Sequence, residues 1–255
     1  MAYSYIIKNA AVIDGTGKPM RKADVGISGK EIKTVGTIDA REGGAPIEGE
    51  GLYLMPGMID LTNHADRNFS LFEAPEAENL VRQGITTMVT GVCGISLAPL
   101  TASEDINVIS PWVDVRGINT NWLSFGEFRE TLGRQNLGIN IITLAGYGTL
   151  AAGGAESALL LFDQACAQGA RGFSVSLHHT PGQAISEASL LAFADHARER
   201  GGFLTFHVRD EGSDFLSSVA EVIRIARLSG ARTLLAETYF FAGDGFLPMA
   251  TSRSP

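Results

Sequence analysis

Four side chains of types that bind zinc each follow a short apolar run of the sequence. His64 and Cys93 follow the first two of these runs, and His207 and Glu237 follow two later ones. The C-terminal ends of parallel strands lie on one face of an α/β protein, where active sites form. If the runs are such strands, imidazole, thiolate and carboxylate groups meet on that face as candidate zinc ligands.

Three of these positions also have ordinary structural explanations. His64 lies in a polar cluster and would serve equally as a solvated loop histidine, and the nearby Asp66 would be a ligand or a helix N-cap. Cys93, between glycines that allow close backbone approach, would be a ligand or a small buried hydrophobic residue. Glu237 would bind a metal, act as a base or face solvent. Residue types alone leave these alternatives open.

His207 is the strongest single candidate. It ends the apolar run 202–206 and is followed at once by Arg209, Asp210 and Glu211. An imidazole at a strand end, with an arginine two residues later, suits a metal beside a substrate carboxylate. The alternative is a core histidine that forms a hydrogen bond with Asp210 or Glu211.

The other histidines and the second cysteine are weaker candidates. We expect one of the adjacent His178 and His179 to face the site and the other to face solvent. His196 falls in the middle of a predicted helix, on its outer side. Cys166 lies on the apolar face of another predicted helix and is expected to be a buried hydrophobic residue.

The elements that position these residues are of two kinds. Residues 1–54 show short strand patterns separated by glycine turns, which is typical of small antiparallel β structure. In residues 55–243 apolar runs alternate with helical segments, such as 186–200 and 214–229, which indicates repeated βα units. Residues 244–255 lack periodicity and are predicted to be a tail. The six predicted strands after residue 55 end near Leu61, Val92, Leu144, Leu177, Phe206 and Ala236.

Six strands do not complete an eight-stranded barrel. The predicted fold is therefore an incomplete TIM-type (β/α)8 barrel that follows a small N-terminal β segment. The other arrangement of repeated βα units is a doubly wound sheet with helices on both faces.

Composition restricts the class of protein further. The chain has 255 residues, a net charge of −8 and two cysteines. An acidic balance without a basic cluster argues against a nucleic-acid partner, and two cysteines in different contexts indicate a reducing compartment. The N-terminus has no signal-peptide pattern, and the uncharged residues 137–155 are better explained by a buried strand followed by a glycine-rich loop than by a membrane helix. These features predict a cytoplasmic protein that does not span a membrane.

Six segments of the sequence share their order and spacing with a known family. They are Asn9–Gly17, Pro56–Asp60, Arg82–Thr87, Gly91–Gly94, Pro181–Gly182 and His207–Gly212. In these segments the chain resembles the amidohydrolase superfamily and, within it, the N-acyl-D-amino-acid deacylase (D-aminoacylase) family. The resemblance runs from about Tyr5 to Ala236.

The resemblance implies a (β/α)8 barrel with a small β domain made from both chain ends. It also implies zinc-dependent hydrolysis of the amide bond of a small-molecule substrate, an N-acyl-D-amino acid. By the same resemblance Cys93 and His207 are zinc ligands, and Arg209 lies near the substrate.

The sequence departs from the family pattern at three places. The family's first strand ends in His-x-His, whereas this chain has Thr62-Asn63-His64. Glu237 stands where the family has another zinc-binding histidine, so the candidate ligands are Cys93, His207, His64 and Glu237. The family's catalytic aspartate belongs to an eighth strand that this sequence does not contain. We therefore expect this chain alone to hydrolyse such substrates weakly or not at all.

Two functions follow from these features. The first is a zinc-dependent amidohydrolase that acts on N-acyl-D-amino acids or related amides. The second is a non-catalytic, truncated or degenerate family member that acts as a binding or partner-association module. An incomplete barrel exposes strand edges and apolar helix faces, which favour association, including a homo-oligomer. The zinc content of the purified protein separates the two functions.

Overall fold

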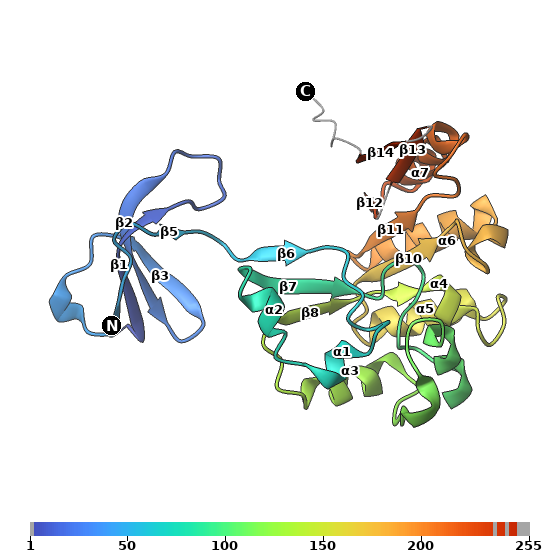
Figure 1. Ribbon diagram of the computed structural model, residues 1–255, viewed down its shortest axis with the longest axis horizontal. Coiled ribbons are helices and arrows are strands. Elements are labelled where there is room, and N and C mark those ends of the chain that lie inside the picture. Colours follow the sequence, from blue (N-terminus) through green and yellow to red (C-terminus); the bar gives the residue numbers. More distant parts are fainter. Residues whose placement is uncertain (1–2, 237–238, 243–244, 249–255) are drawn as a thin grey trace. The chain divides into compact units, whose positions relative to one another are not determined.

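The computed structural model describes residues 3–236, 239–242 and 245–248. The chain forms two compact units, residues 1–58 and 59–255 (Figure 1). The first unit is a five-stranded sheet in which β1 pairs with β2, β4 and β5. Its strands are β1 (Tyr5–Val12), β2 (Arg21–Ser28), β3 (Glu31–Gly36), β4 (Ala45–Glu48) and β5 (Tyr53–Leu54).

The first unit is a mixed sheet, which differs from the antiparallel structure that its sequence predicts. The β1–β2 and β2–β3 pairs are antiparallel, and Gly29 between β2 and β3 has the positive φ that a tight turn requires. However, β4 and β5 pair with β1 in parallel. Parallel pairing needs a crossover connection rather than a hairpin, and the pattern of short turns in the sequence does not reveal which strands such a connection joins.

In the second unit the apolar runs form strands in the predicted places. The run that ends near Leu144 is split into β8 and β9, but the Leu144 amide still donates to the Thr90 carbonyl, at 3.0 Å. All six predicted strands are present. They are β6 (Met58–Asp60), β7 (Ile85–Thr90), β8 (Asn140–Thr143) with β9 (Ala145–Gly146), β10 (Gly172–Ser176), β11 (Phe203–His207) and β12 (Arg232–Leu235).

Four longer helices alternate with these strands, and they are α3 (Phe125–Gly133), α5 (Ala158–Ala167), α6 (Glu187–Glu199) and α7 (Phe215–Ser229). The last two confirm the predicted helices. Single turns of α-helix occur at α1 (Ser70–Glu73), α2 (Glu78–Val81) and α4 (Tyr147–Leu150), and 3-10 segments at η1 (Ala40–Glu42), η2 (Ser103–Ile109), η3 (Val115–Gly117) and η4 (Gly182–Ala184). None of the helices in the described ranges has the length and apolar character needed to cross a membrane.

The order of strands decides between the two arrangements of βα units. The strands form two sheets, β6-β7-β8 and β9-β10-β11-β12, and in each they follow one another in chain order. The ladders that join β7 to β8 and β9 to β12 are parallel. Right-handed crossovers that advance in one direction place their helices on the same side of the sheet, whereas a doubly wound sheet reverses direction. Accordingly α3, α5, α6 and α7 pack against one another in sequence (Figure 1). The second unit is part of a (β/α) barrel.

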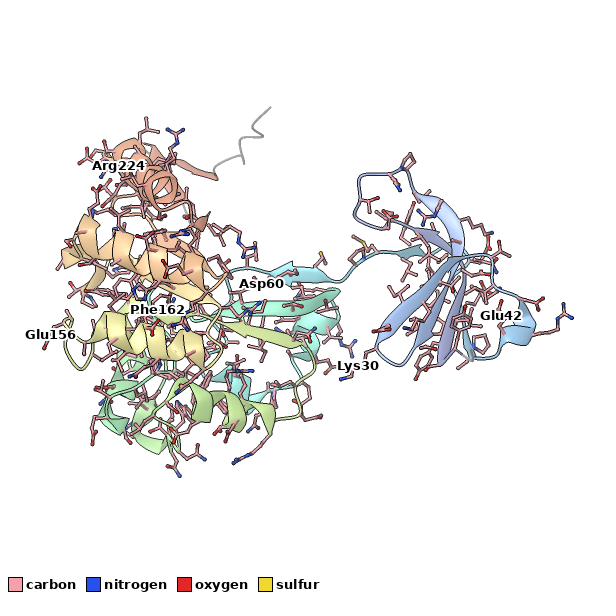
Figure 2. The ribbon with its side chains drawn as sticks, turned by 180° about the vertical axis from the view of Figure 1, so that it is seen from behind. Lys30, Glu42, Asp60, Glu156, Phe162 and Arg224 are labelled. Atoms are coloured by element: carbon pink, nitrogen blue, oxygen red, sulfur yellow. The ribbon has the colours of Figure 1, made fainter. Side chains whose placement is uncertain are left out.

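Aromatic rings fill the layer between these helices and the strands. Phe162 of α5 is fully buried and meets Phe173 of β10, with ring centroids 5.5 Å apart (Figure 2). Phe173 in turn stacks on Phe193 of α6 at 4.2 Å. Each buried aromatic side chain contributes about 3–5 kcal/mol to stability by the cost of its replacement with alanine. The layer therefore holds the strands that carry the candidate site.

Two details differ from the sequence-based expectation. Residues 147–150, expected to be a loop, form the single turn α4. Residues 245–248, expected to belong to a tail, form β14 (Gly245–Pro248), which pairs with β13 (Tyr239–Ala242) in an antiparallel ladder. Both elements have four residues, which is too short for a periodic pattern to be recognised.

The ends of β7 and β9 approach so closely that no side chain fits between the segments. A Cβ atom at Gly91 would lie 2.2 Å from the Leu144 carbonyl oxygen, and one at Gly146 would lie 2.5 Å from the Gly94 carbonyl carbon. Backbone atoms on both sides leave little room for relaxation. Glycine is therefore required at these positions, and the turn that carries Cys93 lies directly against the end of β9.

We expect Gly146→Ala to destabilise the protein by about 1–3 kcal/mol or more, because the added methyl group overlaps backbone that cannot move aside. Gly133→Ala at the end of α3 is the matched control, since nothing lies within 4 Å of a Cβ there. It should leave stability unchanged or raise it by up to about 1 kcal/mol. Urea denaturation of the two variants measures the difference, and equal midpoints would contradict the close approach.

Candidate active site

Cys93 lies in a turn whose backbone is left-handed at three positions. Gly91, Cys93 and Gly94 have φ values of +73°, +53° and +78°. Glycine adopts this region at no cost, but a residue with a Cβ is rarely found there outside sites where the surroundings enforce it. The turn therefore aims the Cys93 side chain in a direction that an extended strand end would not give.

Hydrogen bonds from three other segments hold this turn. The buried carboxylate of Asp66 accepts from the Gly91 amide at 2.7 Å. Ser174 of β10 accepts from the Gly94 amide at 3.1 Å and donates to the Gly91 carbonyl, and the Gly148 amide donates to the Gly94 carbonyl at 2.7 Å. The position of Cys93 is thus fixed by β10, α4 and the loop after β6.

Asp66 does not cap α1, whose N-cap residue is Phe69. Its side chain is almost completely buried and also accepts from the Arg67 amide at 2.9 Å. Burial raises the pKa of the Asp66 carboxyl to about 6, against the lowering effect of these two amide donors. Of the alternatives for Asp66, the N-cap is wrong, and the carboxylate instead connects the loop after β6 to the end of β7.

His207 ends β11, opposite Ser176 in the ladder with β10. Its Nε2 atom lies 3.1 Å from a carboxylate oxygen of Glu211, one turn further along the chain. When Nε2 donates this hydrogen bond, the lone pair of the ring is on Nδ1. Histidines that bind metals commonly donate their other nitrogen to a carboxylate in this way.

The two adjacent histidines after β10 do not divide between site and solvent as predicted, because His179, which lines the cavity, is the more exposed of the two and His178 is half-buried. The His179 side chain lines the cavity described below, whereas Nδ1 of His178 lies 3.2 Å from the Arg209 carbonyl oxygen. The His178 and His207 rings are stacked, with centroids 5.7 Å apart. The pKa of His179 is lowered below its usual value, mainly by partial burial and to a smaller extent by the neighbouring His178 and His207 imidazoles.

Cys93 and His207 line one cavity at the C-terminal ends of the strands, with a volume of about 340 Å³. Ser176 is also part of the wall, and its hydroxyl is buried without a hydrogen-bond partner. A buried polar group in this state is a place where a ligand can satisfy a hydrogen bond. Much of the remaining wall is apolar and includes Ile95, Val108, Pro111, Trp112, Tyr147 and Val175.

His64 is not part of the cavity wall, but its neighbour Arg67 is. The Nη2 atom of Arg67 lies 2.9 Å from Nδ1 and 3.1 Å from Nε2 of His64. The guanidinium also lies 4.4 Å from the centre of the Trp112 ring. In this arrangement a cation stands beside the imidazole, so coordination of zinc by His64 would require Arg67 to move.

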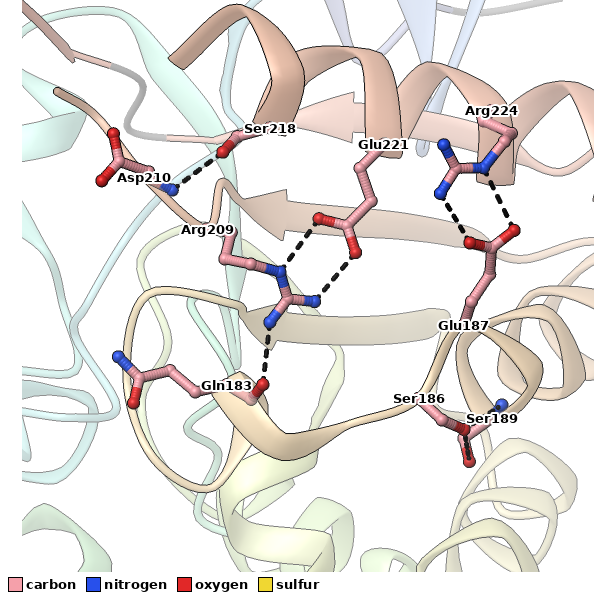
Figure 3. A network of polar contacts seen from close by, with 9 residues as sticks. All are labelled: Gln183, Ser186, Glu187, Ser189, Arg209, Asp210, Ser218, Glu221 and Arg224. Carbon is pink, nitrogen blue, oxygen red and sulfur yellow. Dashed lines mark hydrogen bonds and ion pairs between the residues drawn. The ribbon is translucent and has the colours of Figure 1, made fainter. Parts of the chain in front are cut away.

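Arg209 forms an ion pair outside the cavity wall. Its guanidinium is held by both carboxylate oxygens of Glu221 on α7, at 3.1 and 2.8 Å, and by the Gln183 carbonyl at 2.8 Å (Figure 3). The Glu221 hydrogen bond raises the pKa of Arg209. The contact of Arg209 with a substrate stays a prediction, and Glu237 lies outside the residues that the structure describes.

Two residues that were set aside on sequence grounds lie away from the cavity. Cys166 packs against the core from α5, as predicted, and burial raises the pKa of its thiol to about 11. His196 lies on α6 with Nδ1 3.5 Å from a carboxylate oxygen of Asp163. Both residues serve as controls for the site.

The described donors of this cavity meet the requirements of zinc in part. A thiolate and an imidazole are two preferred ligand types, and both share one wall with an unsatisfied hydroxyl. Within the described ranges, however, no three histidine, cysteine, aspartate or glutamate side chains converge closely enough to hold an ion. A catalytic zinc ion has three protein ligands. The described residues thus fit zinc in donor type, with one sulfur and one imidazole donor on the same wall.

Sequence reasoning did not single out Arg67, Trp112 or Ser176. Arg67 follows His64 by three residues, and no spacing in the sequence links it to the strand ends. Trp112 comes from the long segment between β7 and α3, which has no strand pattern. Ser176 was the detectable one, because it lies at the C-terminal end of a predicted strand, as Cys93 and His207 do.

No protein-family model matches the chain. It is 32% identical over 248 residues to an N-acyl-D-aspartate deacylase of Alcaligenes xylosoxydans xylosoxydans, covering 91% of this chain and 48% of the relative. The crystal structure of a D-aminoacylase that defines a novel subset of amidohydrolases superimposes with a TM-score of 0.79 at 30% identity, over 91% of this chain and 51% of that one.

A third relative carries a metal. It is the N-acyl-D-glutamate deacylase from Bordetella bronchiseptica, solved with zinc and a phosphonate inhibitor that mimics the tetrahedral intermediate of its reaction. It matches with a TM-score of 0.78 at 28% identity, over 91% of this chain and 51% of its own. The chain spans about half the length of these relatives. It belongs to the N-acyl-D-amino-acid deacylase (D-aminoacylase) family of the amidohydrolase superfamily.

Proposed function

We propose that this chain provides the cysteine and histidine ligands of a zinc-dependent amidohydrolase site for N-acyl-D-amino acids. The observation that carries the proposal is the shared cavity wall of Cys93 and His207. Support comes from relatives that are named as deacylases of such substrates and from the zinc in one of their structures. A bound zinc ion would polarise the amide carbonyl and lower the pKa of its water to about 7.

The chain's own residues prepare such a site in two ways. The enforced left-handed turn at Cys93 holds the thiol before any metal arrives, so less ordering accompanies binding. The Glu211 carboxylate lies 3.1 Å from Nε2 of His207 and orients the ring. In both cases the orientation of the ligand side chain is set by groups that would not contact the ion: the backbone of the turn for Cys93 and the Glu211 carboxylate for His207.

In this proposal His64 and Glu237 are the remaining candidate ligands of the zinc ion. His64 approaches the cavity through Arg67, which would have to release the imidazole. Glu237 follows β12, next to β11 in the sheet, so its place in the chain suits a carboxylate ligand on the same edge. Either residue would raise the protein ligands to the three of a catalytic zinc site.

A non-catalytic association module is the second candidate. It is favoured by the lack of a three-ligand group in the described residues and by β6, an edge strand with an exposed apolar neighbour, Leu61. Unpaired strand edges invite another chain. This function predicts a stable oligomer without zinc, whereas the amidohydrolase site predicts zinc in the purified chain.

We expect the purified chain to hold about one zinc ion, and Cys93→Ala or His207→Ala to lose most of it because each removes a ligand. Glu211→Gln should weaken zinc binding by about 10–100-fold, since it removes the charge that supports His207. Competition with a chelator, read by mass spectrometry of the metal, gives these affinities. Cys166→Ala and His196→Ala are the matched controls. Equal zinc content in all variants would contradict the assignment.

We expect residues 1–255 to hydrolyse N-acyl-D-amino acids slowly in the presence of zinc, because the described residues bring together fewer than three metal-binding side chains at one place and general acid–base catalysis contributes about 10²–10⁴-fold. A panel of N-acyl-D- and N-acyl-L-amino acids assayed for free amine measures this, with Cys93→Ala as the baseline. Turnover comparable to that of a full-length relative would mean that this chain contains the base. Asp66→Asn and Asp210→Asn would then be the first variants to assay.

A further inference from the structure

Two arginines lie near the candidate site, and their surroundings differ. The Nε and Nη2 atoms of Arg209 donate to the Glu221 carboxylate, and its Nη1 atom donates to the Gln183 carbonyl (Figure 3). Arg67 forms no ion pair with any carboxylate in the described part of the chain, and its Nε atom is buried without a hydrogen-bond partner. A guanidinium offers five donors, so Arg67 retains capacity for an anion that Arg209 has already used.

The Arg67 guanidinium is nevertheless held in place. Its face lies 4.4 Å from the centre of the Trp112 ring, within the range of a cation–π interaction. Its Nη2 atom lies beside His64. These two contacts restrict the side chain without neutralising its charge, because neither an aromatic ring nor an imidazole carries a negative charge.

The cavity wall places the Arg67 cation beside an apolar surface. Arg67 is the one lysine or arginine among the residues that line the cavity in the described chain, and none of the lining residues is an aspartate or glutamate. Ile95, Val108 and Pro111 form an apolar part of the same wall. A ligand that suits such a wall is an anion with a hydrocarbon portion. Among anions, a carboxylate matches the planar guanidinium with two parallel hydrogen bonds.

We propose that Arg67, rather than Arg209, binds the carboxylate of the ligand, and that the apolar wall beside Trp112 receives its hydrocarbon portion. The inference rests on the proposed function only in taking the ligand to be an N-acyl-amino acid. The two Nη atoms of Arg67 donate the hydrogen bonds to the carboxylate. Arg209 instead fixes the loop after β11 to α7 through Glu221.

The test uses N-acetyl-D-leucine and its primary amide, which differ only in the carboxylate. Binding is followed by calorimetry and by quenching of Trp112 fluorescence, because the other tryptophan, Trp122, is buried. We expect the unaltered chain to bind the acid more tightly than the amide. Arg67→Met should lower the affinity for the acid by at least about tenfold, the effect of losing one charge-assisted hydrogen bond, and should abolish the preference for the acid. Arg67→Lys should restore part of the preference.

Arg209→Met is the matched control and should keep the preference for the acid. Loss of the preference in Arg209→Met with retention in Arg67→Met would overturn the proposal, and so would equal binding of acid and amide by the unaltered chain. Zinc content, measured on the same samples, tests the proposed function separately. A chain without zinc that still prefers the acid through Arg67 would refute the zinc site and support this inference.

Discussion

The close approach of the backbone at the ends of β7 and β9 is the constraint on which the site depends. It excludes side chains at Gly91 and Gly146 and forces the chain after β7 into a left-handed turn. Cys93 is the left-handed residue of that turn that has a side chain, and it occupies a conformation that costs about 1–3 kcal/mol. Hydrogen bonds from Asp66 and Ser174 offset this strain. The thiol is therefore positioned by hydrogen bonds between its turn and the neighbouring segments.

The charge of the described cavity wall is opposite in sign to the net charge of the chain. The protein carries a net charge of −8, yet the described cavity wall contains Arg67 and no carboxylate. Low-dielectric walls strengthen the field of an isolated cation. An acidic exterior with a cationic cavity favours small anions over polyanions, which is consistent with an acylated amino acid as ligand.

The six strands and two longest helices could be predicted because their apolar runs and helical spacing are local properties of the sequence. The parallel pairing of β4 and the β13–β14 hairpin could not, since they depend on contacts between distant or very short segments. Cys93 and His207 were detectable as strand-end residues. Arg67 was not detectable. Its role depends on the contact with Trp112, 45 residues away in the sequence, and on the lack of a carboxylate partner in the described chain, and a local sequence pattern reveals neither.

X-ray absorption at the zinc edge tests the central claim most directly, because it identifies the atoms bound to the ion. With zinc held by Cys93 and His207, we expect one sulfur at about 2.3 Å together with nitrogen or oxygen ligands at about 2.0–2.2 Å. In Cys93→Ala the sulfur contribution should vanish, while in Cys166→Ala it should persist. A zinc environment without sulfur in the unaltered chain would contradict the assignment of this cavity as the metal site.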